Sequence, residues 1–111
     1  MPVIKIDYDK SKVKETVVQK IAVELQKTAA EASKLPLARV SVFARANQLT
    51  VNAAPIEIYV QVGSTSIPGG DTKKYLGLMK KRMQAFKKAH NITTPINISI
   101  IPMNWKSEIG I

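Results

Sequence analysis

The stretch Met1-Pro2-Val3-Ile4-Lys5-Ile6-Asp7 opens the chain and predicts a β-strand from its start, because three of its residues are β-branched. Pro2 costs such a strand no hydrogen bond when it stands at the first strand position. Once Met1 is removed, Pro2 carries a secondary amine fixed at a strand end. Such an amine acts as a general base near neutral pH if its surroundings lower its pKa. The alternative interpretation is that Pro2 simply begins a strand.

Composition sets the class of protein. The 111 residues allow one domain, 1–111, and a hydrophobic content of 45% is enough for a packed core. The absence of cysteine excludes disulfides and thiolate sites, and the single histidine, His90, argues against a histidine metal site or a Ser-His-Asp triad. The sequence shows neither a secretory leader nor an apolar run of membrane-spanning length, so we expect a cytoplasmic protein with no membrane span.

The charge is strongly positive, with 17 Lys and Arg against 8 Asp and Glu and a formal net charge of +9. Such a balance favours an anionic partner, which includes nucleic acid, a lipid surface or a small carboxylate substrate. The alternative is a solvated basic surface without a partner.

Periodicity divides the rest of the chain into elements. Apolar residues at four-residue spacing predict a helix of about twenty residues that Pro36 ends. Alternating patterns predict strands over residues 39–46, 56–62 and 96–101, and a second amphipathic helix lies between the last two. A short strand at 49–51 is an option within the polar loop 47–55.

These elements form two βαβ units, 1–46 and 55–102, with the same layout. They predict an α/β (α+β) fold in which one four-stranded sheet carries two helices on one face. A ferredoxin-like sandwich and a pseudo-twofold pair of parallel βαβ units both fit this order. In either arrangement the other face of the sheet is left open, and we expect a second subunit to cover it.

The second helix is basic over most of its surface. Its cations are Lys73, Lys74, Lys80, Lys81, Arg82, Lys87 and Lys88. A basic amphipathic helix contacts nucleic acid or acidic lipid in some proteins and is only a solvated outer face in others. The RNA-recognition version of this element order needs exposed aromatic residues on its central strands, where the third strand offers only Tyr59 and the first offers none before Tyr8. Nucleic acid is therefore not an expected partner.

The opening residues, the corner Lys34-Leu35-Pro36-Leu37 and the end of the second unit at Ile101-Pro102-Met103-Asn104 together resemble the tautomerase superfamily. That superfamily includes 4-oxalocrotonate tautomerase, 5-carboxymethyl-2-hydroxymuconate isomerase and macrophage migration inhibitory factor. The resemblance covers nearly the whole chain in layout. It implies a cofactor-independent homotrimer, with no metal, whose pockets lie at subunit boundaries.

The resemblance also implies a set of site residues. Pro2 would be the catalytic base that moves a proton on a small anionic keto-enol acid, with cations holding the carboxylate. Lys34 matches the lysine before the proline corner of the inhibitory factor, and Lys12 falls where the shorter enzymes have an arginine. The second-strand arginine of those enzymes falls at Ser41, with Arg39 and Arg45 expected on the same strand face. The substrate-binding candidates are therefore Lys34, Arg39, Lys12 and Arg45.

Two other hypotheses compete with the isomerase. One is a non-catalytic protein of the same fold that binds a partner or an anionic surface through its basic helix. The other is a ferredoxin-like binding module. The isomerase requires that Met1 leaves, because a retained methionine converts the Pro2 amine into an amide without basicity.

Overall fold

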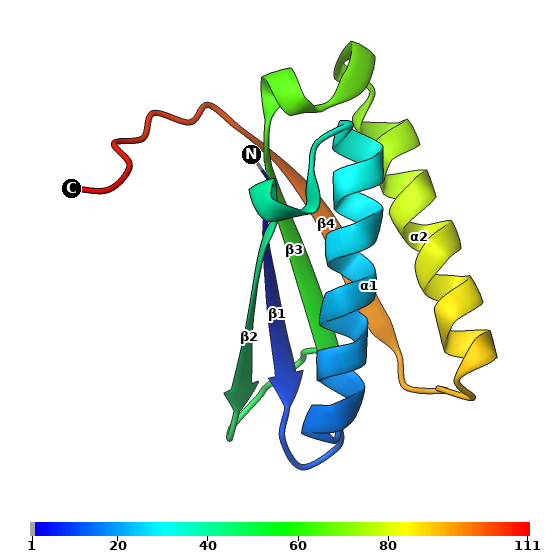
Figure 1. Cartoon of the computed structure of the whole chain (residues 1–111). Coiled ribbons are helices and arrows are strands. Elements are labelled where there is room, and N and C mark those ends of the chain that lie inside the picture. The colour runs from blue at the N-terminus through cyan, green and yellow to red at the C-terminus, as the bar shows by residue number, and fades with distance from the viewer. Residues whose placement is uncertain (1) are drawn as a thin grey trace.

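The computed structural model describes residues 2–111, in which four strands and two long helices alternate as expected (Figure 1). In chain order the main elements are β1 (Val3–Asp9), α1 (Glu15–Ser33), β2 (Ser41–Asn47), β3 (Ile56–Gly63), α2 (Thr72–Ala89) and β4 (Ile96–Met103). Three short 3-10 turns connect them: η1 (Leu37–Arg39), η2 (Ser64–Ser66) and η3 (Pro68–Gly70).

The strand order of the sheet is β2-β1-β3-β4. β1 runs parallel to β2, β3 runs parallel to β4, and the two units meet through the antiparallel pair β1–β3. A ferredoxin-like split βαβ unit leaves a gap between its two strands for a further strand. Here the two strands of each unit are direct neighbours, so the structure selects the pseudo-twofold arrangement and confirms the predicted fold class.

Both helices cover the same face of the sheet, and the core lies between them and the strands (Figure 1). The even-numbered residues of β1 and β3 point into this core, which makes Ile4, Ile6, Ile58 and Val60 fully or almost fully buried. The alternating pattern of the two central strands therefore has a direct cause: one set of side chains packs under helices and the other faces outward.

The outward set forms what we call the open face of the sheet. The strand register places its side chains in three rows across the sheet. From β2 to β4 the rows are Ser41-Val3-Gln61-Ile101, Phe43-Lys5-Tyr59-Ser99 and Arg45-Asp7-Glu57-Asn97. Phe43 is 61% exposed there.

Two element boundaries differ from the sequence predictions. β4 continues through Pro102 to Met103, whereas a break at Pro102 was expected. β4 is an edge strand, where a proline removes no hydrogen bond that the sheet needs. Residues 49–51 form no strand, and Leu49 and Val51 are more than four-fifths exposed in the loop. No helix within residues 2–111 is long and apolar enough to cross a membrane.

Candidate active site

Pro2 lies directly before β1, the strand that occupies a central position in the sheet. Its side chain is fully buried and continues the alternation that buries Ile4 and Ile6. Its carbonyl oxygen accepts a hydrogen bond from the backbone N–H of Ser41 at 3.2 Å. Packing of the proline ring and the backbone hydrogen bond to the start of β2 therefore both fix Pro2 at this end of the sheet.

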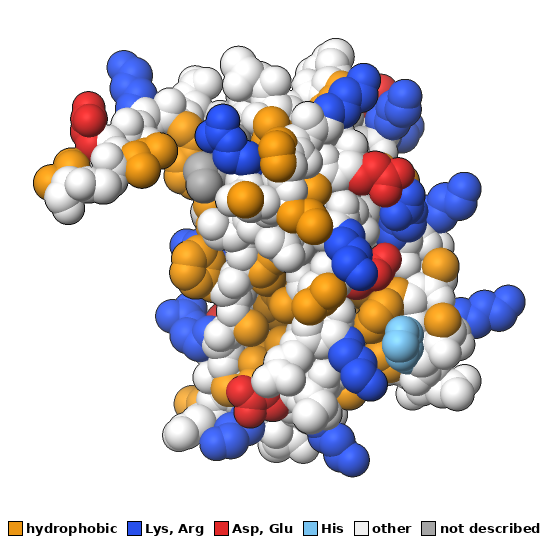
Figure 2. Space-filling view, in the orientation of Figure 1, with side chains coloured by type: hydrophobic (Ala, Val, Ile, Leu, Met, Phe, Trp, Pro, Cys, Tyr) orange, Lys and Arg blue, Asp and Glu red, His pale blue; other side chains and the backbone are white. Residues whose placement is uncertain are grey.

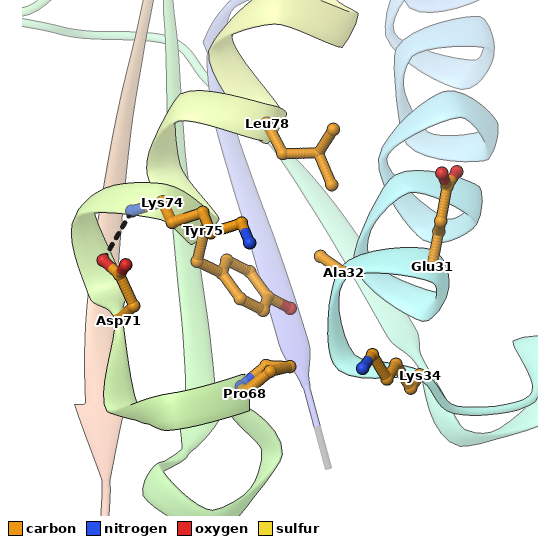
Figure 3. Close-up of a pocket in the computed structure, with 8 residues that line it drawn as sticks. All are labelled: Glu31, Ala32, Lys34, Pro68, Asp71, Lys74, Tyr75 and Leu78. Atoms are coloured by element: carbon orange, nitrogen blue, oxygen red, sulfur yellow. Dashed lines mark hydrogen bonds between the residues drawn. The ribbon is translucent and has the colours of Figure 1, made fainter.

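Lys34 lies at the same end of the molecule, because α1 runs back along β1 and ends where β1 begins (Figure 1). It terminates α1 in the left-handed conformation (φ 55°, ψ 46°), and its backbone N–H caps the helix carbonyls. Figure 3 shows Lys34 at the mouth of a cavity of ≈ 280 Å³ between the end of α1 and the start of α2. The cavity is lined by Glu31, Ala32, Lys34, Pro68, Asp71, Lys74, Tyr75 and Leu78.

Arg39 is also at the Pro2 end, but the prediction that it belongs to the second strand is wrong. It ends the 3-10 turn η1, and β2 begins two residues later at Ser41. Pro36 has φ −63°, which suits a tight turn, and its carbonyl oxygen accepts the Arg39 N–H at 3.0 Å. Arg39 therefore does not share a strand face with Arg45, and its side chain is exposed beside the start of β2.

Lys12 and Arg45 lie at the opposite end of the sheet. Lys12 follows the end of β1, and its Nζ lies 3.9 Å from Oδ2 of Asp9, the last residue of that strand. On the open face, Nε of Arg45 lies 3.3 Å from Oδ1 of Asp7. At about 3.3 Å per residue, the length of β1 separates Pro2 from Asp9 by about 23 Å. Within one chain the structure brings Pro2, Lys34 and Arg39 to one end and leaves the other two cations at the far end.

Two ionisable groups are perturbed. The pKa of Asp9 is lowered, first by hydrogen bonds from the Ser11 hydroxyl (2.6 Å) and backbone N–H (2.9 Å), and less by Thr50 and Lys12, while partial burial opposes the shift. The pKa of Tyr75 is raised by burial, which the hydrogen bond with Ser33 partly offsets. Both groups serve the architecture: Asp9 organises the turn before α1, and Tyr75 joins the helices.

Lys5 is a further exposed cation beside a surface hollow, and it is not among the site residues predicted from the sequence. This lysine lies on the open face between Phe43 and Tyr59, and it lines a shallow hollow between β1 and β2. Strand alternation predicts its outward position, because Lys5 falls between the core residues Ile4 and Ile6.

Among residues 2–111, no group of three or more His, Cys, Asp or Glu side chains gathers into a metal-binding arrangement.

Several solved structures have a fold similar to that of this chain. A 5-carboxymethyl-2-hydroxymuconate delta-isomerase matches 99% of this chain over 89% of its own length, with a TM-score of 0.71 and 10% sequence identity. A macrophage migration inhibitory factor-like protein from Entamoeba histolytica matches 96% of this chain over 95% of its own (TM-score 0.62, 13% identity). A fused wild-type 4-OT, an asymmetric trimer, matches 92% over 86% (TM-score 0.65, 8% identity).

This chain has the tautomerase-superfamily fold. No protein-family model and no curated protein matches its sequence. The structural neighbours include isomerases and tautomerases, yet their identity to this chain is so low that they share its fold alone.

Proposed function

We propose that this protein is a cofactor-independent tautomerase or isomerase that moves a proton on a small anionic keto-enol acid, with Pro2 as the base. The observation that carries the proposal is the position of Pro2: a buried proline at the start of a central strand, at the same end of the molecule as Lys34 and Arg39. The fold shared with named isomerases supports it further.

The chemistry follows from these groups. After removal of Met1, the neutral Pro2 amine takes a proton from the carbon next to the substrate carbonyl, so that a C–H bond breaks and an N–H bond forms. The electron pair moves onto the carbonyl oxygen as an enolate. Lys34 and Arg39 bind the carboxylate and stabilise that negative charge. The Pro2 ammonium then returns the proton to another carbon of the conjugated system, which completes the isomerisation without an oxidant or a cofactor.

Base catalysis requires a neutral Pro2 amine, and burial and nearby positive charge are two effects that favour the neutral form of an amine. Pro2 is buried at the end of the molecule that also carries Lys34 and Arg39. The rigid ring directs the nitrogen lone pair in one direction, which limits the entropy lost on reaching the reactive geometry.

We also propose that the active protein is a homotrimer. The open face carries Phe43, Tyr59 and Ile101 among polar side chains, and a partly apolar sheet face of this kind is suited to burial against further copies. We further propose that the subunits associate so that Lys12 and Arg45 of one subunit lie near the Pro2 end of another. The 4-OT neighbour is a trimer, which supports this arrangement.

Two measurements test the enzyme proposal. The intact mass of the purified protein should show that Met1 is absent. Enol–keto conversion of phenylpyruvate and of 2-hydroxymuconate should fall about 10²-fold or more in the Pro2→Ala variant, since general-base catalysis contributes at least that factor. Pro95→Ala is the matched control, because Pro95 is exposed just before β4, at the opposite end of the sheet. Uniformly retained Met1, or an unchanged rate in Pro2→Ala, would overturn the proposal.

A further inference from the structure

The outer face of α2 carries lysines in a repeat of seven residues. Three adjacent pairs make up the repeat: Lys73-Lys74, Lys80-Lys81 and Lys87-Lys88. Seven residues are nearly two helical turns, so successive pairs stand above one another, about 10.5 Å apart along the axis. In Figure 2, Lys and Arg side chains project from the side of the molecule that α2 occupies. We call these six residues the lysine strip.

The strip has two rows with a neutral line between them. At 100° per residue, Gly77 and Gln84 fall between the row that starts at Lys73 and the row that starts at Lys74. Both residues are exposed, and they too are seven apart. A Cβ atom added at Gly77 would meet no atom within 4 Å, so internal packing does not require this glycine. The neutral line therefore carries no side chain at Gly77 and an uncharged one at Gln84, with lysines on both sides.

No carboxylate within the helix neutralises the strip. α2 contains no Asp or Glu, and within residues 2–111 none of the six lysines forms an ion pair. The paired cation of α2 is Arg82, whose guanidinium contacts Glu31 of α1 at 2.6 Å on another side of the helix. α1 is different: Lys20 and Lys27 each have a glutamate four residues later on the same helical face.

The N-terminal end of the strip opposes the stability of the helix, whereas Lys87 and Lys88 in the last turn complement the helix dipole. Lysines in the first turn meet the positive end of the helix dipole, and Lys73 and Lys74 stand there. A local arrangement that disfavours the folded state is expected where a binding partner supplies the compensating charge.

We propose that the lysine strip binds the sugar–phosphate backbone of duplex nucleic acid without reading its sequence. A major groove is about 12 Å wide, admits an α-helix and is bordered by a phosphate row on each side. The two lysine rows match those two borders, and the neutral line of Gly77 and Gln84 faces the groove. From Lys73 to Lys87 the strip is about 21 Å long, which corresponds to about six base pairs of duplex.

The composition of the strip argues against other anionic partners. Stable binding of a helix to a lipid surface uses apolar residues that enter the membrane, and the large apolar residues Tyr75, Met79 and Met83 of α2 are buried in the core. Single-strand binding uses aromatic side chains for base stacking, and the strip has none. The aromatic residues Phe43 and Tyr59 lie on the open face of the sheet, away from the strip, so phosphate contacts made by α2 do not involve them.

Duplex binding by the strip does not require the proposed isomerase activity, although Lys74 also lines the cavity beside Lys34. The strip lies on the helix layer, and the open face lies on the other side of the sheet (Figure 1). Subunits that associate through their open faces would therefore leave every strip accessible. An oligomer would present several strips, and simultaneous binding of two of them to one duplex raises the apparent affinity.

The test measures binding of a fluorescein-labelled 24-base-pair DNA duplex of mixed sequence by fluorescence anisotropy between 50 and 200 mM NaCl. The Lys80→Gln/Lys81→Gln variant should bind at least tenfold more weakly at low salt. Its slope of log K against log salt should be less steep by up to about 1.8, because each lost phosphate contact removes about 0.9. Lys80→Arg/Lys81→Arg keeps the charge and should bind as the wild type does.

The matched control is Lys20→Gln/Lys27→Gln, which removes the same charge from α1 and should change the affinity by less than twofold. All four substituted lysines are exposed, and circular dichroism and the thermal midpoint would verify that both variants fold. Equal weakening by the two Gln variants would mean that only net charge matters and would overturn the proposal. No duplex binding at 50 mM NaCl, tighter binding of single strands, or preferential binding of phosphatidylserine vesicles would overturn it as well.

Discussion

The Ser33 hydroxyl oxygen lies 2.7 Å from the Tyr75 hydroxyl oxygen, and this contact joins the end of α1 to the start of α2. Both side chains are buried, at 7% and 4% exposure. The Tyr75 hydroxyl also lies 3.5 Å from the Ala29 carbonyl oxygen, so it donates there and accepts from Ser33. The pair positions the two helix ends that enclose the cavity beside Lys34.

Replacing Tyr75 with Phe should lower the free energy of unfolding by about 1–3 kcal/mol, because it leaves the buried Ser33 hydroxyl without its partner. Ser33→Ala should cost less, since the Tyr75 hydroxyl keeps the Ala29 carbonyl. Urea denaturation of both single variants and the double variant gives the coupling energy, which we expect at about 1 kcal/mol. Tyr59→Phe on the open face is the control, and strictly additive single effects would contradict the interaction.

Tyr75 should also affect stability at alkaline pH. Its pKa in the folded protein is raised above the ordinary value of 10.0, mainly by burial. The stabilisation from burying the neutral phenol is therefore complete below pH 10 and declines as the pH rises through the folded-state pKa. The urea midpoint of the wild type should fall more steeply between pH 9 and 11 than that of Tyr75→Phe. Parallel curves for the two proteins would show that Tyr75 titrates equally in both states.

Asp9 should contribute strongly to the loss of stability at acid pH. Its pKa is lowered from the ordinary value of 3.8, chiefly by the two hydrogen bonds from Ser11. A lowered carboxylate pKa stabilises the folded state above that ordinary value, and the contribution is lost as the pH falls through the folded-state pKa. Asp9→Asn should therefore flatten the decrease of the urea midpoint below pH 4, and Ser11→Ala should flatten it partly. Identical acid profiles for wild type and Asp9→Asn would contradict this role.

Much of the fold could be predicted from side-chain periodicity. The alternation of β1 and β3 follows directly from packing under helices, and the four-residue spacing in α1 marks its buried face. Arg39 was placed wrongly because it directly precedes the alternating residues Val40 and Val42, and this alternation does not show that a 3-10 turn ends at Arg39. Its hydrogen bond to the Pro36 carbonyl, which decides the turn, is a three-residue contact that hydrophobic periodicity does not report.

The candidate site was harder to predict for a different reason. The length of β1 places Lys12 far from Pro2 in any single chain, and this separation follows from the sequence alone. Whether a second chain brings the two together depends on how the open faces associate. That association depends on the surface formed by three rows of side chains from four strands. Such a surface cannot be predicted from the pattern of residues within any one strand.

Phe43 provides a test of that association. It is a large side chain on the open face with 61% of its surface exposed, in a row with Lys5 and Tyr59. Phe43→Glu would replace an apolar side chain of the proposed subunit contact with a charged one that must lose its hydration on burial, so light scattering coupled to size exclusion should show a monomer in place of a trimer. Leu49→Glu is the control, since Leu49 is 84% exposed in the loop before β3. A trimer that persists in Phe43→Glu would place the interface elsewhere.

Lys12 and Lys34 should contribute to the same active site from different subunits. Pro2 and Lys34 share one end of a chain, whereas Lys12 lies beyond the other end of β1, so in the proposed trimer it would reach Pro2 from a neighbour. Each of the variants Lys12→Gln and Lys34→Gln should raise KM for the keto-enol acid, since each removes a cation that binds the carboxylate.

Mixing the subunits of two variants tests whether Lys12 and Lys34 come from the same chain as Pro2 or from a neighbouring chain. Pro2→Ala and Lys12→Gln subunits refolded together should regain activity, because some sites then combine an intact Pro2 from one chain with an intact Lys12 from another. Pro2→Ala mixed with Lys34→Gln should regain none, since every site built from one chain's Pro2 and Lys34 carries one of the two substitutions. Recovery in both mixtures would place Lys34 across the boundary as well. Recovery in neither would mean that Lys12 acts within its own chain or outside the site.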